Sequence, residues 1–110
     1  MQTDIRERAA GSFVLSLRGE LDHHASGEVI ARLRECTGRI PFRELELDLG
    51  GVTFSDSSGI AVAVLARRLS AGAGGSLSIK NTPPQMQRLF RTAGLGRMLG
   101  ETTMQEGRRK

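Results

Sequence analysis

Residues 45–69 read Leu-Glu-Leu-Asp-Leu-Gly-Gly-Val-Thr-Phe-Ser-Asp-Ser-Ser-Gly-Ile-Ala-Val-Ala-Val-Leu-Ala-Arg-Arg-Leu, and their periodicity changes in the middle. At the start, leucines alternate with Glu46 and Asp48, which predicts a half-buried strand. At the end, Ile60–Leu69 is rich in Ala, Leu and Val and contains neither Gly nor Pro, which predicts a helix. The segment therefore predicts a strand that turns directly into a helix.

The turn between this strand and helix is Ser55-Asp56-Ser57-Ser58-Gly59, which sets one carboxylate among three hydroxyls. The first turn of a helix has N–H groups without intrahelical partners and carries about half a positive charge. Ser and Asp commonly cap such an end, and the same geometry tolerates a phosphate attached to a serine. The turn is therefore either a helix cap alone or a regulated hydroxyl.

The chain before this segment predicts another strand-to-helix unit. Alternating apolar residues predict a strand at Phe13–Leu17, and residues 3–9 allow an edge strand. The strand leads through Gly19-Glu20-Leu21-Asp22 into a helix whose apolar face consists of Val29, Ile30 and Leu33. We expect Asp22 or Ser26 to cap this helix and Gly38 to end it.

The chain after the segment predicts one more strand and one more helix. Ala71–Gly75 indicates a turn, and Leu77 and Ile79 indicate a strand. Thr82-Pro83-Pro84-Gln85 has the pattern of a capping box with proline in the first helical turn. The helical spacing that follows comprises Met86, Leu89, Phe90 and Ala93. We expect Gly94 to end this helix, Leu95–Leu99 to pack back on the sheet, and residues 101–110 to form a polar tail.

Strands that alternate with helices predict an α/β fold, a small mixed sheet of four to five strands with helices packed on it. The length of 110 residues fits a single domain, with its core over about residues 10–100. Strand-to-helix turns of such sheets lie at the carboxyl edge, where α/β domains usually place their sites. If the two strands are neighbours, Asp22 and Ser58 share one surface.

Composition narrows the classes of function. The net charge is +4, but the arginines are scattered and Trp and Tyr are absent, so we predict no direct nucleic-acid partner. No apolar run reaches the roughly 18 residues that cross a membrane, and the N-terminus has no apolar signal region. The single Cys36 cannot form an internal disulfide and is expected to be a packing residue, which fits a reducing cytoplasm.

A small serine hydrolase is the enzymatic alternative. Ser57 or Ser58, with His23 or His24 and Asp22, supplies the residue types of a catalytic triad. The spacing of a nucleophile elbow is only half met, and so small a domain leaves little room for a substrate pocket. The adjacent histidines also lack the spacing of metal ligands. We therefore predict no catalytic site, no metal and no cofactor, which leaves the regulated hydroxyl.

Three motifs together resemble STAS-domain anti-sigma-factor antagonists, and the similarity covers about residues 10–100. The motifs are Gly-Glu-Leu-Asp-His-His-Ala at 19–25 before a helix, Asp-Ser-Ser-Gly-Ile at 56–60, and Pro84 opening a helix that closes in Gly94-Leu95. The first of them is most similar to the sporulation-type branch. The resemblance implies the STAS fold.

This resemblance also implies a function for the hydroxyl. It implies a cytoplasmic anti-anti-sigma factor that, when unphosphorylated, captures an anti-sigma factor, itself a serine kinase, and so frees the sigma factor. The kinase uses ATP to phosphorylate the second serine of Asp-Ser-Ser-Gly, here Ser58, which ends the capture, and a separate phosphoserine phosphatase resets the switch. The antagonist itself is then not an enzyme.

The partner-binding residues implied by the resemblance surround Ser58. Asp22 would favour an arginine opposite it, and the full set is Glu20, Asp22, His23, Asp56, Ser57 and Gly59. Members of this type are often acidic whereas this chain is basic, so the charge of the partner surface is not carried over. Within the same fold, a subunit of a stressosome or of a transporter-associated complex is the alternative.

Overall fold

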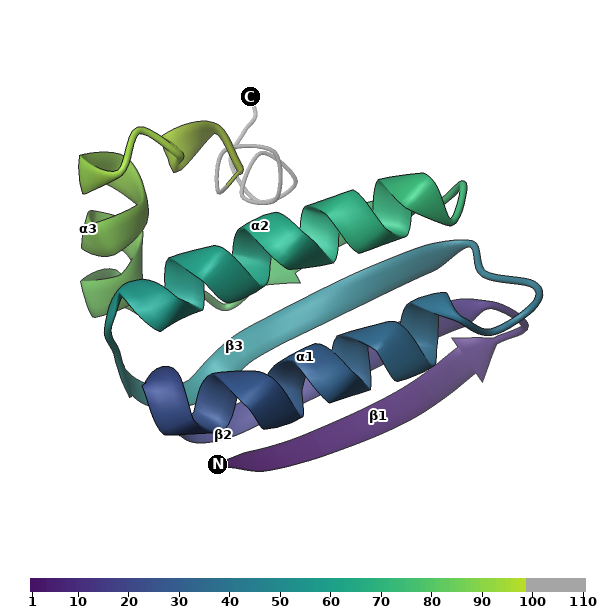
Figure 1. The fold of residues 1–110 in the computed structure, drawn as a ribbon, viewed down its shortest axis with the longest axis horizontal. Coiled ribbons are helices and arrows are strands. Elements are labelled where there is room, and N and C mark those ends of the chain that lie inside the picture. The colour runs from purple at the N-terminus through teal and green to yellow at the C-terminus, as the bar shows by residue number, and fades with distance from the viewer. Residues whose placement is uncertain (99–110) are drawn as a thin grey trace.

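A four-stranded sheet forms the centre of the fold in the computed structural model, which describes residues 1–98 (Figure 1). The strands lie in chain order: β1 (Gln2–Ala9), β2 (Ser12–Leu21), β3 (Glu44–Ser55) and β4 (Ser76–Lys80). β1 is antiparallel to β2, whereas β2 with β3 and β3 with β4 are parallel. The mixed sheet is therefore confirmed with four strands, and the edge strand allowed for residues 3–9 is present.

Two helices, α1 (His23–Thr37) and α2 (Ser57–Gly72), lie side by side over the sheet (Figure 1). Each connects two parallel neighbours, and right-handed crossovers place both helices on the same face. The third helix, α3 (Pro84–Thr92), stands at the end of the sheet beside the start of α2 (Figure 1). The predicted helix at Ile60–Leu69 is confirmed but longer at both ends. It begins directly after Asp56, and the N–H of Ala73 still donates to the carbonyl oxygen of Leu69.

The alternation in β3 decides which of its side chains reach the core. Leu45, Leu47 and Leu49 are at most 1% exposed, whereas Glu46 and Asp48 between them remain partly exposed. Cys36 of α1 belongs to the same core. Burial, with a smaller effect from the charge of Glu35, raises the pKa of the Cys36 thiol to about 11. The thiol is therefore protonated at neutral pH, which agrees with the prediction of a packing residue.

The predicted capping box at the start of α3 is wrong. The helix begins at Pro84, its N-cap is Pro83, and no side chain caps it. Proline fixes φ near −65° and suits the first helical position, so the helix begins at the second proline and leaves Thr82 too early to cap it. The end of α3 is as predicted, because Gly94 follows with a φ of +78°.

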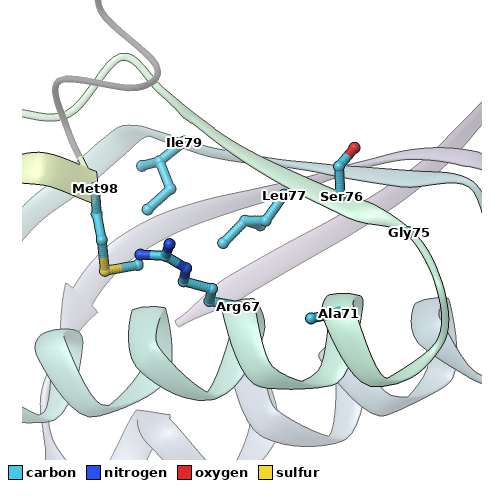
Figure 2. A pocket seen from close by; sticks show the side chains of 7 residues that line it. All are labelled: Arg67, Ala71, Gly75, Ser76, Leu77, Ile79 and Met98. Atoms are coloured by element: carbon cyan, nitrogen blue, oxygen red, sulfur yellow. The ribbon is translucent and has the colours of Figure 1, made fainter.

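The segment after α3 returns to the sheet, as predicted for Leu95–Leu99. Leu95 packs against the core and Met98 is 4% exposed, while Leu99 and the predicted tail at 101–110 lie outside the described residues. Met98 borders a cavity of about 190 Å³ between α2 and β4, opposite Arg67 and Leu77 (Figure 2). This cavity lies beside the C-terminal half of α2 rather than at its first turn. Within residues 1–98, no helix is long and apolar enough to span a membrane.

We expect Leu47→Ala to lower the free energy of unfolding by about 2–5 kcal/mol, because it leaves a cavity in the centre of the core. Urea denaturation monitored by circular dichroism measures this change. Ile40→Ala is the matched control, since Ile40 is 97% exposed and its truncation should change the stability by less than about 0.5 kcal/mol. Equal losses in the two variants would contradict the assignment of the core.

Candidate functional site

The β2–α1 and β3–α2 turns lie side by side at one end of the sheet. Leu21 and Ser55 are partners in the parallel ladder, and the backbone N–H of Asp56 donates to the carbonyl oxygen of Leu21 at 3.3 Å. Adjacent parallel strands bring the turns that follow them to the same edge. Asp22 and the Asp56–Gly59 segment therefore share one surface, which is the juxtaposition expected from the sequence.

Each of these turns ends in an aspartate that caps the following helix. Asp22 Oδ1 accepts a hydrogen bond from the backbone N–H of Ala25 at 2.9 Å, and Asp56 Oδ1 accepts one from the backbone N–H of Ser58 at 2.7 Å. Both aspartates have an extended backbone, as N-cap residues do. The capping of α1 by Asp22 is thus confirmed. In α2 the two serines follow the cap as its first two residues.

The carboxylate of Asp56 connects the starts of both helices. Hydrogen bonds from Ser58, first from its backbone N–H and then from its hydroxyl, lower the pKa of Asp56, and partial desolvation opposes them. The backbone N–H of His23 and the charge of its imidazole lower the pKa further. Asp56 is therefore ionised at neutral pH, and its negative charge lies beside the hydroxyl of Ser58.

The two serines at the start of α2 differ in exposure. Ser57 is exposed, whereas Ser58 is partly exposed. The positive end of α2 and the ionised Asp56 both act on the Ser58 hydroxyl. This is a position where the helix favours added negative charge and the neighbouring carboxylate opposes it.

Gly59 is buried beneath the turn and allows close packing there. A Cβ at Gly59 would lie 2.0 Å from Ser55 Oγ and 3.0 Å from Met86 Cε. Ser55 is also buried, and its hydroxyl donates to the carbonyl oxygen of Asp56 at 2.8 Å. Because Gly59 is buried, its role in the turn is to allow close packing. The direct contact between Gly59 and a partner stays a prediction.

Gln85 is a site residue that the sequence reasoning missed. Its Oε1 accepts a hydrogen bond from the backbone N–H of Ser55 at 3.0 Å, and its Nε2 donates to the carbonyl oxygen of Ser55 at 2.8 Å. The sequence pattern places Gln85 in a capping box, where its side chain would bind the backbone of its own helix. The pattern therefore gives no reason to expect a partner 30 residues away. No signal in the sequence pairs Gln85 with Ser55.

The exposed and partly exposed side chains at the two turns form a surface that we call the Ser58 rim. It consists of Glu20, Asp22, His23, Phe54, Asp56, Ser57 and Ser58. Phe54 was not predicted to belong to it; it pairs with Glu20 across the strands and is 48% exposed. Three carboxylates make the rim acidic, although the chain carries a net charge of +4. The rim is thus an acidic surface with one exposed aromatic ring.

The catalytic arrangement of a serine hydrolase is not formed. In the described part of the chain, no hydrogen bond joins Ser57 or Ser58 to His23 or His24, and both imidazoles are exposed. No group of three or more His, Cys, Asp or Glu among residues 1–98 could hold a metal ion. The chemistry available at the rim is that of a hydroxyl beside a helix start.

Comparison with known proteins gives consistent matches. The family described as "Mlab, STAS domain" matches residues 5–101. An anti-sigma F factor antagonist of Paenibacillus polymyxa is 31% identical over 93 residues, which cover 84% of this chain and 80% of that protein. The anti-sigma factor antagonist SpoIIAA in its unphosphorylated form has a similar structure, with a TM-score of 0.77 and 21% identity over 99% of this chain and all of the other. Bacillus SpoIIAA in its phosphorylated form gives a TM-score of 0.71 and 25% identity, over 88% of this chain and 87% of the other.

The lowered pKa of Asp56 gives a pH-dependent stability. Its ionised form is favoured by folding, so its contribution is complete above the unfolded pKa of about 3.9 and is lost as the pH falls through the lower folded value. Asp56→Asn keeps an oxygen that can cap α2 but removes the charge. We therefore expect wild type to be the more stable protein at pH 7, and the difference to disappear between about pH 5 and pH 2.

Urea denaturation at a series of pH values measures this difference. Asp4→Asn, which removes a carboxylate from the exposed edge strand β1, is the control for the loss of one negative charge. A difference between wild type and Asp56→Asn that stays constant down to pH 2 would show that the charge of Asp56 does not stabilise the turn.

Proposed function

The chain belongs to the STAS-domain family of anti-sigma factor antagonists, which are non-enzymatic regulators, and from this we propose that it captures an anti-sigma serine kinase through the Ser58 rim. In this proposal the unphosphorylated antagonist binds the kinase and frees a sigma factor in the cytoplasm. The observation that carries it is the placement of Ser58 at the start of α2, on the same surface as Asp22. A STAS domain with a serine hydroxyl in the first turn of a helix, beside a second acidic turn, is suited to a phosphorylation switch.

The kinase would transfer the γ-phosphoryl group of ATP to Ser58. The bond from Ser58 Oγ to the γ-phosphorus forms as the bond from that phosphorus to the bridging oxygen breaks, ADP leaves, and the hydroxyl proton passes to a base of the kinase. The hydrogen bond from the backbone N–H of Ser58 to Asp56 supports this reaction, because it fixes the residue that carries the hydroxyl before the kinase binds. A phosphatase would reverse the modification by hydrolysis.

The phosphate would act on docking more than on the fold. It adds about −1.5 to −2 charges at pH 7, which the start of α2 favours and the ionised Asp56 repels. The chain has the same fold as SpoIIAA in both its unphosphorylated and its phosphorylated form, which supports a switch without refolding. A partner docked over the rim would have to desolvate the new charge or face it.

The chemistry of the rim favours a basic partner surface. Asp22 and Glu20 would attract arginines, which bind carboxylates with two parallel hydrogen bonds. Phe54 would add an apolar contact beside Glu20, because exposed aromatic residues often contribute strongly to interfaces. We therefore propose that the partner presents arginine side chains around a shallow apolar depression.

Phosphorylation at Ser58 can be tested with the anti-sigma F factor that gives the Paenibacillus polymyxa relative its name. After incubation with this kinase and ATP, mass spectrometry of the tryptic peptide 44–67 should show one added phosphate, with fragment ions that place it on Ser58. Ser58→Ala should stay unmodified, bind the kinase as wild type does, and lose at most about 1.5 kcal/mol of stability, because Asp56 still caps the helix but no longer has the hydroxyl as a partner. Ser58→Asp should fold and bind at least about tenfold more weakly. Wild-type affinity in Ser58→Asp would contradict the electrostatic account.

The acidic and aromatic contacts of the rim can be tested separately from its stability. Asp22→Asn keeps an oxygen to cap α1 and removes the charge, so we expect the same melting temperature but a roughly tenfold weaker and less salt-dependent capture of the kinase. Phe54→Ala should weaken the capture by a similar factor without altering its salt dependence. Asp4→Asn on β1 is the control and should bind as wild type does. Unchanged binding in both rim variants would place the interface elsewhere.

A further inference from the structure

Among residues 1–98, the last residues of β3 have no neighbouring strand on the side of β4. β4 pairs with β3 only from Glu44 to Asp48, whereas β3 continues to Ser55. On the other edge, β2 follows β3 to its end, with Leu21 opposite Ser55. The last residues of β3 therefore need a partner for their backbone on the side where β4 has stopped.

Ser55 directs its backbone groups toward this open edge. The N–H of the next residue, Asp56, donates to Leu21 of β2, and successive residues of a strand direct their backbone groups to opposite sides. The amide of Gln85 occupies the open side and satisfies both the N–H and the carbonyl oxygen of Ser55. One side-chain amide thus takes the place of the missing strand, because Gln carries a donor and an acceptor side by side on one planar group, as a peptide does.

The next residue of α3 contacts the same turn. Met86 is 1% exposed, and its Cε lies within 3.0 Å of the position a Cβ at Gly59 would occupy. Ser55 Oγ fills the rest of that space and donates to the carbonyl oxygen of Asp56. Two consecutive residues of α3 therefore hold the segment that carries Ser58, one by hydrogen bonds and one by packing.

We propose that Gln85 is a positioning residue that fixes the Ser55–Gly59 turn and so holds the Ser58 hydroxyl in place for phosphorylation. Asp56 follows Ser55 directly, and its Oδ1 accepts the hydrogen bond from the backbone N–H of Ser58 at 2.7 Å. If Ser55 moves, Asp56 moves with it, and this hydrogen bond to Ser58 loses its geometry. The inference has two parts. The effect on phosphorylation of Ser58 rests on the proposed function, whereas the coupling between Gln85 and the turn does not.

Amide hydrogen exchange tests the coupling without any kinase. In Gln85→Leu, which keeps the bulk but removes both hydrogen bonds, the amides of Ser55 and Ser58 should exchange at least about tenfold faster than in wild type. Gln85→Glu keeps the acceptor for the N–H of Ser55 and loses the donor, so it should show a smaller increase; it also serves if Gln85→Leu does not fold. Two-dimensional NMR of the labelled full chain measures both rates.

Gln87→Leu is the matched control on the same helix. Gln87 is also partly buried, but its amide donates to Thr82 and accepts from Arg91, away from the turn. This variant should leave the exchange of Ser55 and Ser58 within about twofold of wild type. The same acceleration in both variants would show that only the stability of α3 matters, and an unchanged Ser58 amide in Gln85→Leu would show that the clamp stops at Ser55. Either result overturns the inference.

Phosphorylation kinetics then test the consequence for Ser58. With the anti-sigma F factor of Paenibacillus polymyxa and ATP, Gln85→Leu should lower kcat about tenfold and change KM little, because a displaced hydroxyl reacts slowly once bound. An unchanged kcat in a variant with accelerated exchange overturns the positioning role and leaves the proposed function intact. If wild type is not phosphorylated at all, the proposed function fails, and the exchange rates still decide whether Gln85 holds the turn.

Discussion

The carboxylate of Asp56 caps α2, and its charge also acts at the start of α1 on the same edge of the sheet. Its Oδ1 accepts a hydrogen bond from the backbone N–H of Ser58 at 2.7 Å, and its pKa is lowered by Ser58 and, to a smaller extent, by His23 at the start of α1. This arrangement is possible because β2 and β3 are neighbours and end together at Leu21 and Ser55. The two helix starts bring several N–H groups and two partial positive charges side by side. Each start is met by one carboxylate, Asp22 at α1 and Asp56 at α2.

The same constraint bears on the proposed phosphorylation of Ser58. Most helix starts accept an added anion without loss, since their N–H groups and dipole favour it. Here the place is already taken by a carboxylate that belongs to the turn, so a second negative group must compete with it for the same donors. In the proposed switch, a phosphate on Ser58 would therefore change the charge of the rim and leave the leucine core beneath it unchanged.

The sequence predicted the parts of this arrangement that depend on local patterns. Alternating leucines in β3, the aspartates before the helices and the neighbouring turns are all local consequences of strand and helix periodicity. Gln85 and Phe54 could not be predicted in this way. The capping-box pattern around Gln85 satisfied every local criterion, yet Pro83 and Pro84 shifted the helix start and left the glutamine to Ser55. Phe54 follows a register shift between β2 and β3, which changes the face of every residue after it.

The two missed residues explain why net charge is a poor guide to the partner of this chain. A value of +4 averages over the whole surface, whereas a partner meets only the residues that the turns bring together. At the rim, those residues include three carboxylates and one aromatic ring. Beside the rim, the neutral amide of Gln85 binds Ser55, the residue that precedes the ionised Asp56. A glutamate there would add a second negative group beside Asp56, in a turn that we propose receives a phosphate. The neutral amide supplies the same reach and both hydrogen bonds without adding that repulsion.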